Sequence, residues 1–232
     1  MLREREFKDY DGENNANIRT GFTAGKTAYL INAKKDELMN YCSECGEKVV
    51  SITPPNDNRE RFVCNVCNMV HYQNPNNVAG AILTWQGKVL LCKRAIEPRY
   101  GKWTLPAGFM ENKETVHQAA ARESIEEANA KPGHLNLFGV FSVPYISQVH
   151  IMFSGPLLDD NISPGIESLE VGLFTEAEIP WDELSFPVVG HSLKLFYKYG
   201  LVPGRVHQAS ISRTPDNEVQ ICSETLEIAN TD

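Results

Sequence analysis

The sequence predicts an α/β domain that follows a small cysteine-rich module. Apolar runs of strand length and two stretches with helical spacing fill the chain from residue 78 to 199. Two Cys-x2-Cys pairs precede them. We expect four segments: a polar N-terminal arm (1–40), the cysteine module (41–70), the main domain (71–203) and a C-terminal extension (204–232). Of the 232 residues 42% are hydrophobic and 22% charged, which is ordinary for a globular protein.

The N-terminal arm is polar and has weak periodicity. Its stretch T-G-F-T-A-G-K-T at residues 20–27 is similar to a phosphate-binding P-loop, but it lacks the first glycine at the required position and no apolar strand precedes it. The arm is too acidic for an organelle transit peptide and has no apolar signal core. No apolar run approaches the ~20 residues that span a bilayer. We therefore expect a cytoplasmic location.

The cysteine pairs form the pattern C-x2-C-x18-C-x2-C. Each pair can place two thiolates on one cation, and two pairs complete a tetrahedral Zn²⁺ site. Two disulfides are the alternative, which a cytosolic location disfavours. The residues between the pairs suggest a hairpin with a turn at residues 54–58. The sequence thus predicts a structural zinc site with the ligands Cys42, Cys45, Cys64 and Cys67.

The charge balance bears on the possible partners. The net charge of −8 and the isoelectric point near 5.3 disfavour a general nucleic-acid or anionic-membrane partner. The cysteine module also carries both signs of charge and has no basic footprint. We expect it to act structurally, as a docked lid or as a dimer element, and we expect a homodimer without nucleic-acid or membrane partners.

The main domain begins with two strands, at residues 78–85 and 88–94, joined by a turn at Gln86-Gly87. Further strands are expected at residues 135–143, 149–153 and 170–174, and Thr175 is expected to cap a short turn. Residues 186–199 carry apolar side chains at helical spacing and predict the last helix.

Residues 114–129 predict the other helix, because they are alanine-rich and contain neither Pro nor Gly. On this helix Glu123 and Glu127 share a face, with Glu126 beside them. Arg122 and Glu114 can pair locally but cannot neutralise all three carboxylates. A hard divalent cation such as Mg²⁺ would, since it prefers oxygen ligands. A solvated acidic face is the alternative.

The spacing G-x5-E-x7-R-E-x2-E-E from Gly108 to Glu127 resembles the Nudix box, the signature of hydrolases of nucleoside diphosphates linked to another group. The stretch W-T-L-P-A-G that leads into it is similar to the family's W-x-L-P-G-G. Two departures are Ser124 at a bulky aliphatic position and Asn129 at the second glycine, where Asn can still terminate a helix in left-handed geometry. The resemblance implies the Nudix fold, a mixed sheet between helices.

The resemblance also implies site residues. Glu123, Glu126 and Glu127 would hold Mg²⁺ (or Mn²⁺), which neutralises the diphosphate and activates a water. Glu170 is expected as an added ligand or base, with a solvated residue before a strand as the alternative. Arg94 would hold phosphate, with a structural salt bridge as the alternative, and Gly108 would adjoin the substrate. Glu114 and Arg122 would be structural in the box.

The zinc ribbon, Y-Q-N-P, K-V-L-L-C-K-R and P-G-I-E-S-L-E together resemble the plant-type FAD pyrophosphatase branch, which also accepts ADP-ribose-type substrates. NADH pyrophosphatases carry S-Q-P-W-P-F after the box, and this chain lacks its W-P-F. We therefore expect FAD or ADP-ribose as substrate and NAD(H) as the alternative. A non-catalytic Nudix module that senses a nucleotide is the alternative from another class.

Overall fold

The computed structural model describes residues 39–200, 202 and 204–227. The expected N-terminal arm up to residue 38, including the P-loop-like stretch at 20–27, lies outside the described residues. The chain divides into two units, with the boundary between His71 and Tyr72. In the described part of the chain, no helix is both long enough and apolar enough to cross a membrane.

The described residues of the first unit form an antiparallel sheet in the order β1-β2-β3. Its strands are β1 Val49–Ile52, β2 Arg61–Cys64 and β3 Val70–His71. The predicted hairpin is present, because Ile52 pairs with Arg61 across the turn. Asp57 stabilises the turn: its carboxylate accepts from the amides of Asn58 and Arg59 and pairs with the Arg61 guanidinium at 2.9 Å.

The second unit is built on one mixed sheet with the order β10-β5-β4-β9-β8-β11-β12. The pairs β4–β9 and β8–β11 are parallel and the other pairs on this path are antiparallel. The short strands β6 and β7 add to β5 and β4. The strands are β4 Asn76–Trp85, β5 Lys88–Arg94, β6 Trp103–Thr104, β7 Ala107–Phe109, β8 Asn136–Val143, β9 Gln148–Pro156, β10 Ser168–Phe174, β11 Arg205–Arg213 and β12 Val219–Glu227.

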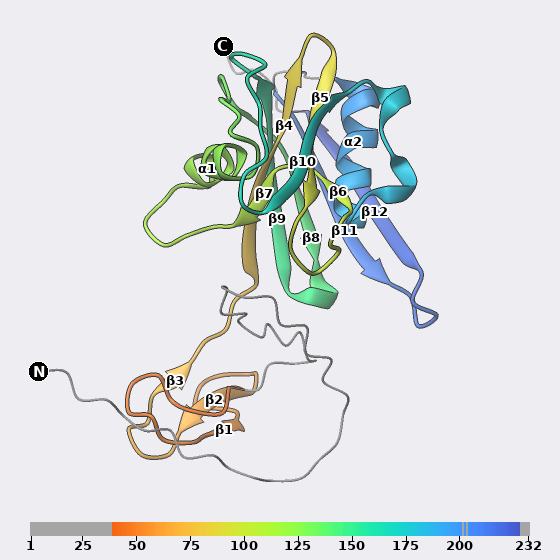
Figure 1. The fold of residues 1–232 in the computed structure, drawn as a ribbon. Helices are drawn as coiled ribbons and strands as arrows, with labels where there is room; N and C mark the ends of the chain where they lie inside the picture. Colours follow the sequence, from red (N-terminus) through yellow and green to blue (C-terminus); the bar gives the residue numbers. More distant parts are fainter. Residues whose placement is uncertain (1–38, 201, 203, 228–232) are drawn as a thin grey trace, which may run out of the picture. The chain divides into compact units, whose positions relative to one another are not determined.

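Two α-helices of the described residues cover opposite faces of this sheet (Figure 1). Helix α1, Val116–Ala128, packs its alanines on a cluster that includes Leu83, Leu90 and Phe153. Helix α2, Pro187–Tyr199, packs on a second cluster that includes Leu91 and Phe141. The small alanine side chains let α1 approach the strands closely, which matters because α1 carries the acidic residues. The observed arrangement is the mixed sheet between helices that the sequence predicts.

The ends of α1 are set by local hydrogen bonds. Thr115 caps the start, since its hydroxyl accepts from the amide of Gln118 while the Gln118 side chain accepts from the amide of Thr115. Asn129 ends the helix in left-handed geometry, with φ 48° and ψ 25°, as the sequence predicts. The other departure, Ser124, is fully buried, and its hydroxyl donates to the carbonyl of Ala120 at 2.7 Å.

Two segments differ from expectation. Residues 107–109 are not among the predicted strands, but they form β7, in which Gly108 pairs with Ala79 of β4. The segment 204–232 was expected as a C-terminal extension, and its described residues join the main sheet as β11 and β12. At residue 175 the expected cap is present, because the Glu178 carboxylate accepts from the amide and hydroxyl of Thr175.

Candidate active site

Helix α1 presents three glutamates with unequal exposure. Glu123 and Glu127 are buried, at 8% and 5% exposure, whereas Glu126 is exposed. The four-residue spacing of the buried pair places both side chains on the helix face that packs toward β7 and β4. Two buried carboxylates on one face repel each other, and burial makes this repulsion stronger than in water.

The guanidinium of Arg122 binds several of these carboxylates at once. It donates to both oxygens of Glu114 at 3.0 and 2.8 Å, to Glu123 at 2.6 Å and to Glu126 at 2.9 Å. It also donates to the backbone carbonyl of Phe109 at 3.1 Å. Arg122 and Glu114 therefore tie the loop before α1 to the acidic residues. Their structural role in the box stays a prediction. Arg122 also holds the pKa of Glu114 at about 2.

Strand β7 lies directly against the buried glutamates. The amide of Ala107 donates to Oε2 of Glu127 at 3.2 Å. A Cβ on the next residue, Gly108, would collide with the carboxylate of Glu123, 2.5 Å from its Cδ. Gly108 thus lies directly against the Glu123 carboxylate, and a side chain at this position would require that carboxylate to move.

The buried carboxylates are electrostatically strained. The pKa of Glu127 is raised to about 8, chiefly by burial, and the charges of Glu123 and Glu167 act in the same direction. The pKa of Glu123 is also raised, again chiefly by burial, while Arg122 opposes the shift. A divalent cation would offset the cost of ionising these buried carboxyls, because its positive charge favours the ionised form of each. Carboxylate oxygens are the donors that Mg²⁺ and Mn²⁺ prefer, so the chemistry of this set fits such a cation. In the described residues the oxygens of the three glutamates are not gathered around one point, so binding of an ion would draw them together.

Glu167 was not predicted from the sequence, yet it raises the pKa of both Glu123 and Glu127. It lies just before β10, and its carbonyl accepts from the amide of Ala95 at 2.7 Å. The stretch E-S-L-E contains both Glu167 and Glu170, and the pairing of β10 with β5 shifts its register between Ser168 and Glu170. Such a register shift is not evident in the sequence.

The two other predicted residues lie on β5 and β10. Arg94, at the end of β5, lowers the pKa of Glu127 by its charge, and its Nε donates to the carbonyl of Pro98 at 2.9 Å. Glu170, on β10, lies across from Lys93, with 3.6 Å between carboxylate and ammonium, and its side chain is 59% exposed. The charge of Arg94 thus acts on Glu127, while its guanidinium contacts Pro98 and the ring of Phe186. Glu170 has an ion-pair partner on the neighbouring strand. The expected roles of both residues stay predictions.

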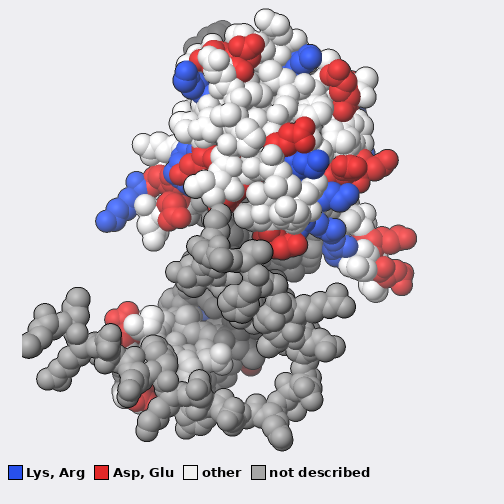
Figure 2. All heavy atoms as spheres, viewed as in Figure 1, with Lys and Arg blue, Asp and Glu red and all other residues white. Residues whose placement is uncertain are grey.

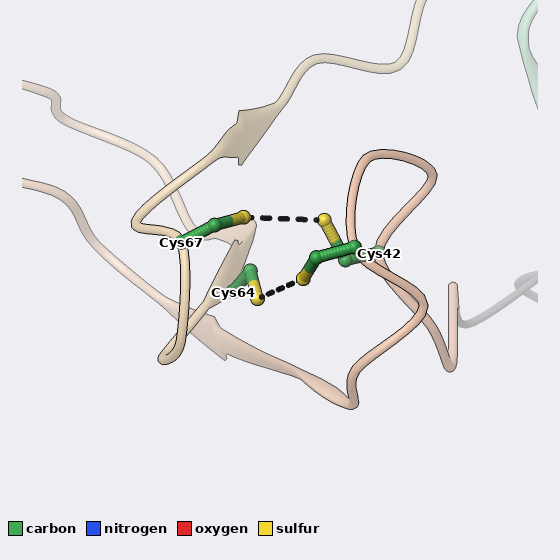
Figure 3. A group of neighbouring side chains, drawn as sticks. Cys42, Cys64 and Cys67 are labelled. Atoms are coloured by element: carbon green, nitrogen blue, oxygen red, sulfur yellow. Dashed lines mark hydrogen bonds between the residues drawn. The ribbon is translucent and has the colours of Figure 1, made fainter.

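The four paired cysteines converge in the first unit (Figure 3). All four Sγ atoms lie within 4.8 Å of one another, with 3.6 Å between Cys42 and Cys67 and 3.4 Å between Cys45 and Cys64. Tetrahedral Zn²⁺ with bonds of ~2.3 Å separates its sulfur ligands by ~3.8 Å, which matches this cluster. All four cysteines are free thiols, so the disulfide alternative is wrong. The cluster fits a structural zinc site.

The surroundings shift the four thiols in different directions. The amide of Glu47 lowers the pKa of the Cys45 thiol, but hydrogen bonds with the other thiols and burial outweigh it and raise that pKa to about 12, and the pKa of Cys67 is also raised.

Backbone amides of Cys67 and Val66 lower the pKa of the Cys64 thiol to about 7. Because the thiolate is the form that binds metal, these amides favour the ligand state. The ring of His71 adds a further contact, with Nε2 3.3 Å from Sγ of Cys42. Among the described residues, this cluster is the one group of thiols whose sulfur atoms lie close enough together to hold one metal ion.

Comparison with known proteins agrees with this geometry. Residues 40–73 match the Nudix N-terminal zinc ribbon family and residues 74–192 match the NUDIX domain. The chain therefore belongs to the Nudix hydrolases, with a zinc ribbon before the catalytic domain.

Individual relatives are of two kinds. The chain is 31% identical to the ADP-ribose pyrophosphatase of Methanocaldococcus jannaschii over 47% of this chain and 67% of that protein. It is 26% identical to the NAD-capped RNA hydrolase NudC of Photobacterium profundum over 61% of this chain and spans about half of that protein, 52%. A NUDIX hydrolase from Nitrosomonas europaea of known crystal structure superposes with a TM-score of 0.71 and 48% identity, covering 75% of this chain and all of that one.

Proposed function

We propose that this Nudix hydrolase is a Mg²⁺-dependent pyrophosphatase that cleaves FAD to FMN and AMP, ADP-ribose to AMP and ribose phosphate, or both. The observation that carries the proposal is the buried pair Glu123 and Glu127 held against Gly108 and Ala107. Two carboxylates buried together are costly without a cation. The same cation would neutralise the diphosphate of a substrate.

The residues divide the work of the reaction. Glu123, Glu126 and Glu127 would hold Mg²⁺ or Mn²⁺, which when bound supplies charge neutralisation and an activated water. Arg122 fixes two of these carboxylates, through 2.6 and 2.9 Å hydrogen bonds to Glu123 and Glu126. Loading the site with metal requires that Arg122 share these oxygens.

Further residues would serve the substrate and the water. Arg94 is proposed to bind a substrate phosphate next to Glu127, and the backbone at Gly108 to adjoin it. The downstream carboxylate that receives a proton from water is assigned to Glu167 or to the predicted Glu170. Glu167 is favoured, because its charge acts on both buried glutamates.

The substrate class is inferred from the sequence context and from the relatives. The zinc ribbon and the P-G-I-E-S-L-E stretch favour the FAD branch, and the M. jannaschii relative favours ADP-ribose. A flavin needs an aromatic or apolar wall. Of the aromatic residues near the box, Phe141 and Trp103 are buried in the core, whereas Tyr145 is 40% exposed. Its ring lies 5.2 Å from the guanidinium of Arg213, and we propose Tyr145 as the wall.

NAD(H) or an NAD-capped RNA is the second candidate, favoured by the NudC relatives. The NADH-branch element W-P-F is missing, and residues 144–146 form a short 3-10 helix that contains Tyr145. The negatively charged phosphates of an RNA would also be repelled by a chain with a net charge of −8. On the face shown in Figure 2, acidic and basic side chains of the described residues are interspersed. We therefore rank a small dinucleotide above RNA.

We also propose that the chain works in the cytoplasm as a homodimer. The dimer is tested by light scattering of the purified protein, where a mass near that of one 26.0 kDa chain would contradict it. Localisation of a C-terminally tagged chain tests the cytoplasmic assignment.

A substrate panel tests the proposed function. FAD, ADP-ribose, NADH, an NAD-capped oligonucleotide and nucleoside triphosphates are each incubated with the protein and Mg²⁺, and products are separated by chromatography. We expect FAD to be cleaved fastest and ADP-ribose next. Faster cleavage of NADH or capped RNA than of both would overturn the substrate assignment. Binding without any turnover would support a nucleotide sensor instead.

A further inference from the structure

The loop before β10 is attached to the end of helix α1 by backbone hydrogen bonds. The amide of Ser163 donates to the carbonyl of Ala128 at 2.9 Å, and the amide of Gly165 donates to the carbonyl of Glu127 at 3.0 Å. The last carbonyls of a helix lack partners within the helix. Here the amides of the loop provide these partners. The backbone of Glu127, one of the proposed metal ligands, is therefore hydrogen-bonded directly to this loop.

The approach of loop and helix is close. A Cβ on Gly165 would collide with the backbone carbonyl of Glu126. Gly165 is two residues before Glu167, and its carbonyl accepts from the amide of Ser168 at 3.1 Å. On the other side, the carbonyl of Glu167 accepts from Ala95 at 2.7 Å. Glu167 is thus held between the end of α1 and the end of β5.

Asn129 adds a side-chain contact to this attachment. Its Nδ2 donates to the carbonyl of Ser163 at 3.1 Å and lies 3.5 Å from the carbonyl of Pro164. The Nudix box has glycine at this position. A glycine adopts φ 48° freely and ends the helix equally well. It has no side-chain amide, however, and so cannot donate to the carbonyl of Ser163. The asparagine is therefore more than a helix terminator.

We propose that Asn129 is a positioning residue that fixes the Glu167 loop to the helix carrying Glu123, Glu126 and Glu127. The proposal rests on the proposed function, because it assigns Glu167 to the same metal-dependent site. The side-chain amide of Asn129 holds the carbonyl of Ser163 in place. The backbone from Ser163 to Gly165 is thereby fixed against the end of α1. Glu167, two residues further on, then keeps its position relative to the buried pair. Loss of the amide widens the range of Glu167 positions without removing any carboxylate.

The test compares Asn129→Gly and Asn129→Asp with the wild-type protein. Asn129→Gly keeps the left-handed backbone and removes the amide. Asn129→Asp keeps the size but turns an acceptor toward the Ser163 carbonyl. Asn217→Gly is the matched control, since Asn217 is also left-handed, at φ 66°, and bonds Arg213 in the β11–β12 turn.

The first readout is steady-state kinetics against Mg²⁺ concentration, on the substrate that the panel identifies. For Asn129→Gly we expect an unchanged melting temperature and KM, and a kcat lowered about fivefold with a higher Mg²⁺ requirement, as for one lost hydrogen bond. Asn129→Asp is expected to lose more, and Asn217→Gly nothing. If Asn129→Gly matches the wild type in kcat and Mg²⁺ requirement, Asn129 is only a helix terminator and the proposal is wrong.

The second readout is amide hydrogen exchange at Ser163 and Gly165, which needs no substrate. We expect both amides to exchange about fivefold faster in Asn129→Gly, with amides in the middle of α1 unchanged. Unchanged exchange at both amides contradicts the attachment. If the wild type cleaves no pyrophosphate, the proposed function fails, and the exchange result still decides whether Asn129 holds the loop.

Discussion

The backbone of Gly108 lies directly against the carboxylate of Glu123. A Cβ on Gly108 would lie only 2.5 Å from Cδ of Glu123. Glu123 is 8% exposed, so its carboxylate has little room to move away. A strand, rather than solvent, therefore forms one wall of the site, and the glycine determines how deeply the carboxylate is buried.

Gly108→Ala is expected to displace the Glu123 carboxylate and lower turnover by more than tenfold, a barrier increase above ~1.4 kcal/mol. The fold should persist, because the colliding group is the end of a flexible side chain. Gly190→Ala in α2 is the control, since its Cβ would meet Leu184 at an ordinary 3.5 Å. That change should leave turnover intact and stabilise the helix by roughly 0.5–1 kcal/mol. Full activity of Gly108→Ala would show that Glu123 needs no fixed position.

The raised pKa of Glu127 predicts how the stability of the metal-free protein depends on pH. The folded-state pKa is about 8, against 4.5 for an ordinary carboxyl. Between these values the folded protein binds more protons than the unfolded chain, so this contribution to stability falls as pH rises from about 4.5 to about 8. Below 4.5 the contribution is fully present.

Melting temperatures measured with a chelator between pH 5 and 8 test this sign. The wild type should lose stability across the range, and Glu127→Gln, which carries no titrating group there, should lose less. Added Mg²⁺ should restore the wild type most at high pH. An equal slope in both proteins would show that burial of Glu127 does not govern the dependence.

The sequence predicts most of the fold because its patterns are local. The bounds of β5, Lys88–Arg94, follow from an apolar run after a Gln-Gly turn, and α1 follows from an alanine-rich run that ends at Asn129. The position of Glu123 and Glu127 on one face of α1 follows from their four-residue spacing. The place of Glu167 does not follow from a local pattern. It depends on the hydrogen bond from the Ala95 amide to its own carbonyl and on the bond from Gly165, two residues earlier, to the end of α1, which join distant parts of the chain.

The strand at Gly108 was missed for the same reason. Residues 107–109 are too short to show alternation, and their pairing with β4 comes from tertiary contacts. The zinc ribbon shows the opposite case, because the spacing of four cysteines is enough to predict a cluster that the structure then brings within 4.8 Å.

Elemental analysis is expected to find one zinc per chain in protein prepared without chelator. Cys64→Ser should lose that zinc and destabilise the N-terminal unit, because the metal contributes folding free energy to such modules. Cys222→Ser is the control, since Cys222 is exposed and lies on β12. Wild-type protein without zinc, or Cys64→Ser with a full zinc content, would contradict the structural site.

Glu127 and its neighbours are proposed to hold the divalent cation on which hydrolysis of a nucleoside diphosphate derivative depends. The most direct measurement is ³¹P NMR of ADP-ribose incubated with wild-type protein or Glu127→Gln, with and without Mg²⁺, after both proteins are shown to melt cooperatively. We predict that the diphosphate signals convert to AMP and ribose phosphate only with wild type and Mg²⁺, and that Glu127→Gln keeps less than about a tenth of the rate. Conversion without a divalent cation, or a folded Glu127→Gln that cleaves as fast as wild type, would contradict the account.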